Sequence, residues 1–318
     1  MHGGAHPVPQ YAWLRRGLLV LALTSLAAAT TAACAAGAHR GEPEAKIRIG
    51  GQPGLLLSAA GSLWTTDLAL GRVVRIDPAS NRIKTRLRVS TRPFGLAYGA
   101  GSVWVADRSL NTLARINPRT NKVSARIKIG YDAYGLTFAA GSAWVTSESD
   151  GTVRRISPKR NRVVAKIKVG TTPNGLAFAF GSLWVANLGS DDVVRIDPAT
   201  NRVTQRIGVE KADWVTPSSD ELWVSSEAGF VARIDPTTGS VERVTVGANP
   251  LASAWVDGEL WVPNLDERTV SVVDPSTRTV RTTIAVGDGP LAVLVAGSAA
   301  WVSHPESGEL WRLPATRP

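Results

Sequence analysis

The 318-residue sequence has a single cysteine, Cys34, one methionine and only four histidines. One thiol cannot form a disulfide within the chain, so the fold must be stable without such a bond. The cysteine and histidine spacings of metal sites are absent, as are the phosphate-binding glycine loop and the nucleophile elbow. Segments with the period of a helix are missing after residue 45, which predicts an all-β fold.

What the sequence has in abundance is one repeated unit, seen most clearly in residues 171–209. Four short runs rich in β-branched and aromatic residues alternate with turn signals, which predicts four antiparallel strands. Gly181-Ser182 is expected to close the first hairpin, because glycine tolerates a positive φ. Residues 197–201 (Asp-Pro-Ala-Thr-Asn) are expected to form the last turn, with asparagine in the left-handed region. The predicted strands are residues 175–178, 182–186, 192–196 and 202–209.

The unit occurs seven times, and its tryptophan recurs at a spacing of 38 to 40 residues. The seven positions are Trp64, Trp104, Trp144, Trp184, Trp223, Trp261 and Trp301. Seven copies of a four-stranded unit of this length are typical of a β-propeller, in which each blade buries its faces against its neighbours. Residues 46–318 are therefore predicted to form one seven-bladed propeller of four-stranded antiparallel blades, with each tryptophan filling the wedge between blades.

The two ends of the repeat array complement each other. Residues 46–50 have the pattern of a fourth strand without the other three, and the last copy, from Pro290, stops after its third strand. The N-terminal strand is therefore predicted to complete the last blade and close the ring. Closure removes a free sheet edge that would favour aggregation.

The first 33 residues differ in kind from the repeats. Arg15-Arg16 precedes an uncharged, mostly apolar run from Gly17 to Ala33, and this order is typical of a secretory signal. A run of about 17 residues is at the short end for a membrane-spanning helix. The sequence thus predicts export, and an uncleaved membrane anchor is the alternative.

Cys34 directly follows small residues in the order Leu-Ala-Ala-Ala-Thr-Thr-Ala-Ala-Cys. This order resembles the lipobox of bacterial lipoproteins, in which such a cysteine becomes the lipidated first residue. The resemblance implies that residues 1–33 are the signal peptide, that Cys34 anchors the protein to the membrane at the cell surface, and that residues 34–45 are a tether. The alternative is an ordinary signal peptide, cleaved near Ala36 or Ala38, and a freely secreted protein.

The formal net charge is +10, and it falls to about +8 when Arg15 and Arg16 leave with the signal. Much of the positive charge lies on fourth strands, where basic and uncharged residues alternate. In the first unit the basic residues are Arg82, Lys84, Arg86 and Arg88. They can contact anionic lipid or wall polymer, or they can keep outer strands from pairing with other chains. No aromatic residues are interleaved with them, so nucleic acid is not an expected partner.

Two sets of residues are expected to surround the mouth of the central channel. The first set follows each repeat tryptophan by three positions and is polar throughout: Asp67, Asp107, Ser147, Asn187, Ser226, Asn264 and His304. The second set follows the proline of each connection between units, which Ala133 and Asp213 replace in two copies: Gly54, Phe94, Tyr134, Asn174, Trp214, Leu251 and Leu291.

A polar ring with an aromatic side is typical of a ligand site. The predicted ligand-binding residues are Phe94, Tyr134, Asn174, Asn187, Trp214, Asn264 and His304. The alternative is that the polar residues only end strands and cap loops.

The unit V-G-x-x-P-x-G-L-A-x-x-x-G-S-L-W-V-A-N-x-x-x-x-x-V-x-R-I-D-P-x-T-N-x-V resembles the YVTN/YncE-type propeller repeat. It is also similar to the virginiamycin B lyase group and, more distantly, to NHL repeats. The resemblance covers residues 46–314 and implies the propeller fold.

Virginiamycin B lyases open a lactone ring by elimination, with a histidine as acid and base and a magnesium ion held by carboxylates. This implies His304 and Glu306 as catalytic residues and magnesium as cofactor. The Trp-Val-Ala-Asn at residues 184–187 departs from the Trp-Phe-Thr-Glu of that group. The interpretation we favour is a monomeric, non-enzymatic propeller without a cofactor, which binds a small ligand or a partner protein at its mouth, with the lyase as the alternative.

Overall fold

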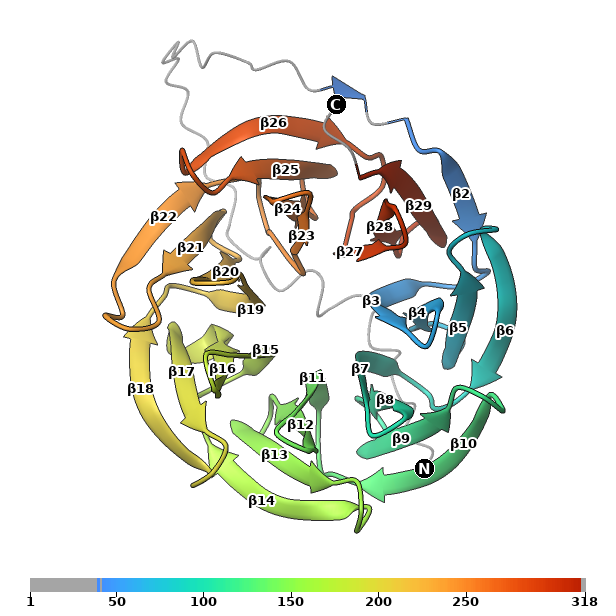
Figure 1. Cartoon of the computed structure of the whole chain (residues 1–318), viewed down its shortest axis with the longest axis vertical. Helices are drawn as coiled ribbons and strands as arrows, with labels where there is room; N and C mark the ends of the chain where they lie inside the picture. Colours follow the sequence, from blue (N-terminus) through green and yellow to red (C-terminus); the bar gives the residue numbers. More distant parts are fainter. Residues whose placement is uncertain (1–38, 41, 316–318) are drawn as a thin grey trace, which may run out of the picture. The chain divides into compact units, whose positions relative to one another are not determined.

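The computed structural model describes residues 39–40 and 42–315. Seven sheets are arranged around a common axis (Figure 1), each with one strand at the centre of the ring and one at the rim. This is the predicted all-β, seven-bladed propeller. The predicted signal peptide, residues 1–33, and the predicted lipidation site Cys34 lie outside the described residues.

Blades 1 to 4 each consist of four consecutive strands, given from the centre to the rim. Blade 1 contains β3 (Pro53–Ala59), β4 (Ser62–Asp67), β5 (Arg72–Asp77) and β6 (Arg82–Arg88). Blade 2 contains β7 (Pro93–Gly99), β8 (Ser102–Asp107), β9 (Thr112–Asn117) and β10 (Lys122–Lys128). Blade 3 contains β11 (Ala133–Ala139), β12 (Ser142–Ser147), β13 (Thr152–Ser157) and β14 (Arg162–Lys168). Blade 4 contains β15 (Pro173–Ala179), β16 (Ser182–Asn187), β17 (Asp192–Asp197) and β18 (Arg202–Gly208), with the 3-10 helix η1 (Leu188–Ser190) after β16.

Blades 5 to 7 complete the ring. Blade 5 contains β19 (Ala212–Pro217), β20 (Leu222–Ser226), β21 (Phe230–Ile234) and β22 (Val241–Thr245). Blade 6 contains β23 (Ala254–Val256), β24 (Glu259–Asn264), β25 (Thr269–Asp274) and β26 (Thr279–Ala285), with β1 (His39–Arg40) as a fifth strand parallel to β26. Blade 7 contains β27 (Ala292–Ala296), β28 (Ala299–His304), β29 (Glu309–Pro314) and the N-terminal strand β2 (Ala45–Arg48).

The first turn of each regular blade needs two successive residues in the left-handed region. In blade 4 these are Phe180 and Gly181, with φ of 51° and 68°, between the ends of β15 and β16. Two positive φ values match the twist of the strands that the turn joins. The predicted turn, Gly181-Ser182, is therefore one residue too late, because Ser182 already belongs to β16.

The second turn of the unit confirms the prediction for residues 197–201. The Asp197 carboxylate accepts the backbone N–H of Ala199 at 2.8 Å, and the N–H of Asn201 donates to the Asp197 carbonyl at 2.8 Å. Asn201 has φ of 58°. The aspartate caps the turn from within, and the asparagine supplies its left-handed residue.

The N-terminal strand closes the ring as predicted. β2 is the outermost strand of blade 7 (Figure 1). It pairs antiparallel with β29, with Lys46 opposite Trp311. Ile47 and Ile49 are buried in the same core cluster as Trp301 and Leu310. The segment expected to be a tether, residues 34–45, includes β1, which pairs with the edge of blade 6.

The repeat tryptophans belong to the core, as predicted. Trp64, Trp104, Trp144, Trp184, Trp223 and Trp301 are fully buried, and Trp261 nearly so. The Trp184 indole packs in one cluster with strands of blade 5, and its Nε1–H donates to the carbonyl of Ala179 at 3.2 Å. Each blade is thus joined to the next through a large ring. In blades 1 to 4 and 7 the indole N–H is bonded inside its own blade, whereas the buried Nε1 atoms of Trp223 and Trp261 have no hydrogen-bond partner among the described residues.

A second contact between blades uses the arginine of the recurring Arg-Ile-x-Pro sequence. Arg155 of blade 3 donates to Ser142 Oγ in its own blade at 2.9 Å, and to the Pro198 carbonyl and Asn201 Oδ1 of blade 4 at 2.7 and 3.1 Å. Its guanidinium lies 4.8 Å from the Trp144 ring centroid. We call this arrangement the arginine latch.

The arginine latch occurs at three successive interfaces between blades. Arg75 binds the Pro118 carbonyl and Asn121, and Arg115 binds the Pro158 carbonyl and Asn161, at distances between 2.6 and 3.4 Å. Hydrogen bonds from a charged donor contribute about 1.5–3 kcal/mol each. The latch therefore explains why the arginine, the proline and the turn asparagine recur together in the sequence.

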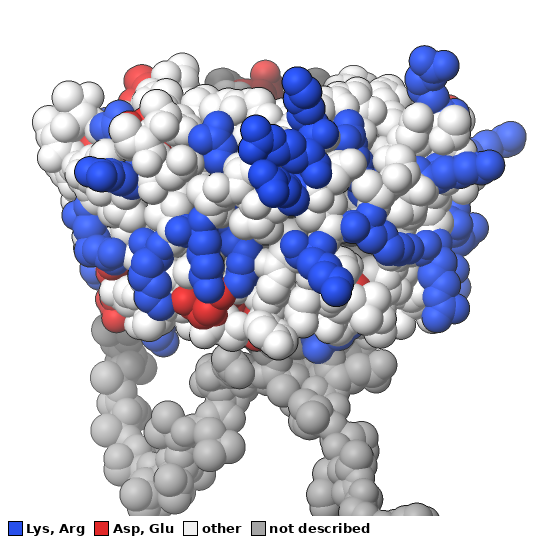
Figure 2. Space-filling view, turned by 90° about the horizontal axis from the view of Figure 1, so that it is seen from below, with Lys and Arg blue, Asp and Glu red and all other residues white. Residues whose placement is uncertain are grey.

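The rim of the ring carries much of the basic charge. The exposed side chains of β6 are Arg82, Lys84, Arg86 and Arg88, and lysines and arginines gather over the side of the ring in Figure 2. In the described part of the chain, no helix is long and apolar enough to cross a bilayer.

Candidate ligand site at the channel mouth

The loops after each second strand and the connections between blades lie on one face, which we call the mouth face. Backbone hydrogen bonds join the two kinds of loop in blade after blade: Arg108 N–H to the Arg92 carbonyl, Leu188 N–H to Thr172, and Glu227 N–H to Lys211, at 3.0, 3.0 and 3.1 Å. The two sets of residues expected around the mouth are therefore carried by neighbouring loops.

The polar set after the second strands is buried and ties these loops together. All seven residues are at most 1% exposed. Asn187 Nδ2 donates to Asp192 at 2.6 Å, and Asn264 Oδ1 accepts the Gly247 N–H at 3.2 Å. Such bonds correspond to the alternative in which these residues end strands and cap loops. Asn187 and Asn264 reach a ligand only if the loops rearrange.

His304 is also inside the protein. Its Nδ1 lies 2.8 Å from the Asp288 carbonyl, its ring packs on Trp311 at 4.7 Å between centroids, and burial lowers its pKa to about 4. Glu306 is 55% exposed and pairs with Arg268 at 3.9 Å. A neutral, buried histidine and an exposed, paired glutamate do not share one surface.

The structure corrects the alignment of blade 5. Ala212 pairs with Ser226 as Pro173 pairs with Asn187, and Val215 pairs with Val224 as Leu176 pairs with Val185. Ala212, and not Asp213, therefore takes the place of the proline. Asp213 occupies the position of Asn174, and Trp214 that of Gly175.

With Asp213 in place of Trp214, the second set of residues forms a ring at the start of the first strands, and one side of this ring is aromatic. The rings of Phe94 and Tyr134 lie 4.2 Å apart between centroids, and the Arg108 guanidinium lies 4.7 Å from the Tyr134 ring. Arg108 forms an ion pair with Glu148 of blade 3. The aromatic pair is thus buried beneath a partly exposed ion pair, which leaves the charged groups toward solvent.

Beside this pair lies an acidic side. Asn174 Nδ2 donates to Asp213 Oδ1 at 2.5 Å, and burial raises the pKa of Asp213 to about 7. Burial, followed by the charge of Asp213, also raises the pKa of Tyr134 well above its ordinary value. The negative charges of Glu148 and Glu227 also raise the pKa of both Asp213 and Tyr134. The structure therefore brings Phe94, Tyr134 and Asn174 into one cluster with Asp213, which the sequence missed.

Trp214 is the one aromatic residue among the seven equivalent positions of the first strands. The equivalent positions hold Leu55, Gly95, Gly135, Gly175, Ala252 and Ala292. Trp214 is partly exposed, and its ring lies so close to Gly175 that a Cβ there would be 2.8 Å from Cε3. The partly exposed indole directly follows Asp213, on which the charge of Glu227 acts, so an aromatic surface lies near acidic groups.

We expect Asp213→Asn to change the pH dependence of stability. The unfolded aspartate loses its proton near pH 4, whereas the folded one keeps it to about pH 7, so the stability of the parent falls as the pH rises between these values. Above pH 7 the variant should be more stable by up to roughly 4 kcal/mol, and below pH 4 the two should be alike. Urea unfolding between pH 4 and 8 measures this. Asp266→Asn, at an exposed acid, is the control, and parallel curves for Asp213→Asn and the parent would contradict the assignment.

The residues of the mouth do not fit the magnesium ion that the lyase alternative implies. Among residues 39–40 and 42–315, no three histidine, cysteine, aspartate or glutamate side chains come together as metal ligands. Two acids of the mouth are already engaged: Asp213 is bonded to Asn174, and Glu148 is paired with Arg108.

Comparison with known proteins supports the fold. No protein-family model matches the sequence, and no curated protein matches it. Among solved structures, a streptogramin B lyase superposes with a TM-score of 0.76 at 15% identity, over 85% of this chain and 96% of that one. Hydrazine synthase of Kuenenia stuttgartiensis superposes with a TM-score of 0.75 at 15% identity, over 83% and 95%. At this identity the likeness concerns the propeller fold alone.

Proposed function

We propose that this protein is a binding propeller that holds a small organic cation at its mouth, against Trp214. The observation that carries the proposal is the partly exposed indole of Trp214 near the acidic groups Asp213 and Glu227 in an otherwise basic protein. The face of an indole attracts cations, and nearby carboxylates strengthen the attraction. Loops that vary on a rigid scaffold suit recognition.

The two acidic groups near Trp214 differ in their surroundings, because the positive charge of Lys211 acts on Glu227, whereas Asp213 is influenced by other acids. Asp213 is bonded to a neutral amide, and Glu227 is exposed next to it. Because burial raises the pKa of Asp213 to about 7, a bound cation would favour its ionised form. Binding of the cation should therefore release a proton near pH 7.

The test uses choline and its uncharged analogue 3,3-dimethyl-1-butanol, which have the same shape. Calorimetric titration should show choline binding at least tenfold more tightly. Trp214→Ala and Glu227→Gln should each weaken choline binding at least fivefold. Tyr131→Ala, at an aromatic residue 69% exposed on the same face, is the control and should bind as the parent does. Equal binding of the two probes would refute the proposal.

A second candidate is the lyase activity, and the raised pKa of Asp213 is the observation that favours it. A carboxyl group that titrates near pH 7 can take up and return a proton. The test is incubation with a streptogramin B and chromatography of the products, because ring opening by elimination leaves the mass unchanged. Activity that survives Asp213→Asn would exclude this residue as the base.

We further propose that the protein is exported and anchored by a lipid at Cys34, and that its repeats are of the YVTN/YncE type. Small residues before a lone cysteine support the anchor. We expect Cys34→Ser to release the protein from the membrane fraction or to leave its signal uncleaved, because no thiol remains for the lipid. Fractionation and the mass of the mature protein measure both effects. Normal processing with unchanged fractionation would contradict the anchor.

A further inference from the structure

The interface between blades 5 and 6 lacks the arginine latch on the face opposite the mouth. Glu221 stands where blades 1 to 4 have the latch serine, since Leu222 pairs with Ile234 as Leu183 pairs with Ile196. In blade 6, Arg278 has φ of 60° at the end of the turn and takes the place of the latch asparagine. Both the serine and the asparagine that bind the arginine in a latch are therefore replaced at this interface.

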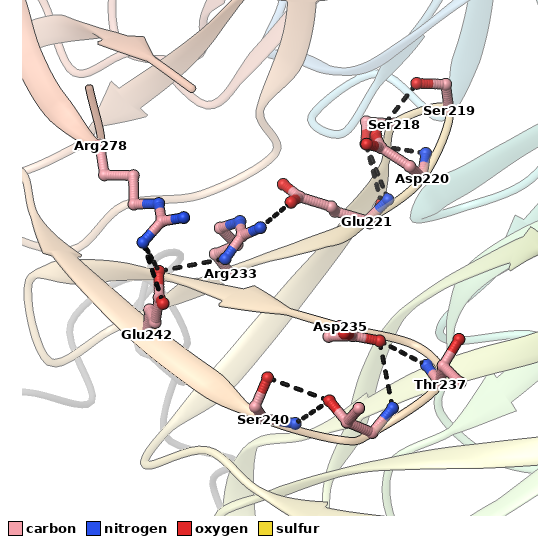
Figure 3. Close-up of polar contacts among 11 residues, drawn as sticks. Ser218, Ser219, Asp220, Glu221, Arg233, Asp235, Thr237, Ser240, Glu242 and Arg278 are labelled. Carbon is pink, nitrogen blue, oxygen red and sulfur yellow. Dashed lines mark hydrogen bonds and ion pairs between the residues drawn. The ribbon is translucent and has the colours of Figure 1, made fainter. Parts of the chain in front are cut away.

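The arginine of blade 5 is held elsewhere. Arg233 pairs with Glu221 and, at 3.1 Å, with Glu242 of its own blade, and Glu242 pairs with Arg278 at 2.8 Å (Figure 3). Arg233 therefore does not reach Pro275, whose carbonyl is the equivalent of the latch acceptors Pro118, Pro158 and Pro198. Among the described residues, no hydrogen bond to the Pro275 carbonyl is found.

A cavity of about 620 Å³ lies where the latch arginine would be, and we call it the seam cavity. Its lining comes from both blades: Pro217, Ser218, Ser219, Asp220, Glu221, Trp255, Gly258, Pro275 and Ser276. Trp255 spans the interface, since its Nε1–H donates to the Pro217 carbonyl at 2.8 Å. The wall thus offers an indole, a backbone carbonyl and hydroxyl groups, which are the kinds of group that hold Arg155 at a latched interface, apart from the amide oxygen of Asn201.

The lining of the seam cavity also contains the negatively charged carboxylate of Asp220. The Asp220 carboxylate accepts the hydroxyls of Ser218 and Ser219 at 3.1 and 3.0 Å (Figure 3), and within the described part of the chain it has no ion pair with a cation. An exposed carboxylate held by two hydroxyls is oriented before a ligand arrives, which lowers the entropy lost on binding.

We propose that the seam cavity binds a guanidinium group, supplied by an arginine side chain of a partner peptide. The chain itself shows the recognition at three other interfaces, where an arginine satisfies a serine, a proline carbonyl and a turn residue at once. At the fifth interface the proline carbonyl is kept, the hydroxyls of Ser218, Ser219 and Ser276 lie in the wall in place of the latch serine, and a carboxylate lies at the edge. A planar guanidinium matches these acceptors better than an ammonium group does.

The test is titration of the purified protein with N-acetyl-L-arginine methylamide and, separately, with the uncharged citrulline analogue. The arginine probe should bind at least tenfold more tightly than citrulline. Asp220→Asn should weaken it at least fivefold. Asp77→Asn is the matched control, because Asp77 lies on the same face and Asn117 occupies the equivalent position in blade 2. It should leave the affinity unchanged.

A restored latch gives the second arm of the test. The double variant Glu221→Ser, Arg278→Asn returns the serine and the turn asparagine of the regular interface and leaves Glu242 as the one acidic partner of Arg233, so Arg233 should enter the seam cavity and exclude the probe. Binding should fall at least tenfold while the melting temperature stays at or above that of the parent. The proposal fails if the parent binds citrulline equally, if Asp220→Asn matches Asp77→Asn, or if the double variant folds and still binds.

Discussion

Deleting residues 45–49 should lower the free energy of unfolding by roughly 3–6 kcal/mol, because two buried isoleucines leave the core of blade 7 at about 1.5–3 kcal/mol each. The loss is a large share of the 5–15 kcal/mol typical of a domain. It also removes the backbone pairing to β29 and frees that strand as an edge. Chemical unfolding measures the change, and sedimentation detects the aggregation that a free edge favours.

Deleting residues 39–40 is the control for this experiment. β1 adds only a two-residue parallel pairing outside blade 6, so its loss should change stability by less than about 1 kcal/mol. If the deletion of residues 45–49 melts like the parent, β2 does not close the ring.

Trp184→Ala should cost roughly 3–5 kcal/mol of stability, as expected for a large residue removed from a core. Its indole is fully buried and packs with Ala186, Val193 and Val215, so the substitution leaves a cavity between blades 4 and 5. The hydrogen bond to the Ala179 carbonyl is lost as well. Urea unfolding at constant pH measures the effect.

Trp214→Ala provides the comparison, since the same substitution on the mouth face removes a partly exposed ring. We expect a loss of less than about 1 kcal/mol, because the ring is partly exposed and leaves no enclosed cavity when it is removed. A variant at Trp214 that unfolds, together with a variant at Trp184 that does not, would reverse the assignment of the two faces.

The architecture could be predicted because the signals that specify it repeat. The tryptophans recur seven times at a nearly constant spacing, and the turns have matching residues. One end of the array has a lone fourth strand and the other end lacks one, which leaves little freedom for another fold. The turn error at Gly181-Ser182 has a physical cause. Glycine marks a left-handed position but does not say whether it is the first or the second residue of the turn, and Phe180 gives no local sign of a positive φ.

The site could be predicted only in part. Trp223 follows Trp184 by 39 positions instead of 40, and blade 5 has no proline to mark its register. The sequence therefore places Asp213 at the proline position, one position too early, and does not reveal its hydrogen bond with Asn174. A polar residue at a strand end has the same pattern whether it binds a ligand or caps a loop. Only the hydrogen bonds of Asn187, Asn264 and His304 separate these cases. The role of Arg155 was missed because its acceptors lie in the next blade.

Closure by β2 also determines when the molecule can finish folding. β2 lies near the beginning of the chain and its partner β29 near the end, as the bond between Arg48 and Glu309 across 261 positions shows. A chain made from its N-terminus onward therefore carries β2 without a partner until β29 has been synthesised. Blades built from neighbouring strands can form early, whereas the last blade waits for a contact of very high sequence separation, which is slow to form. Ring closure is thus expected to be a late event, because it needs β29 to have been made.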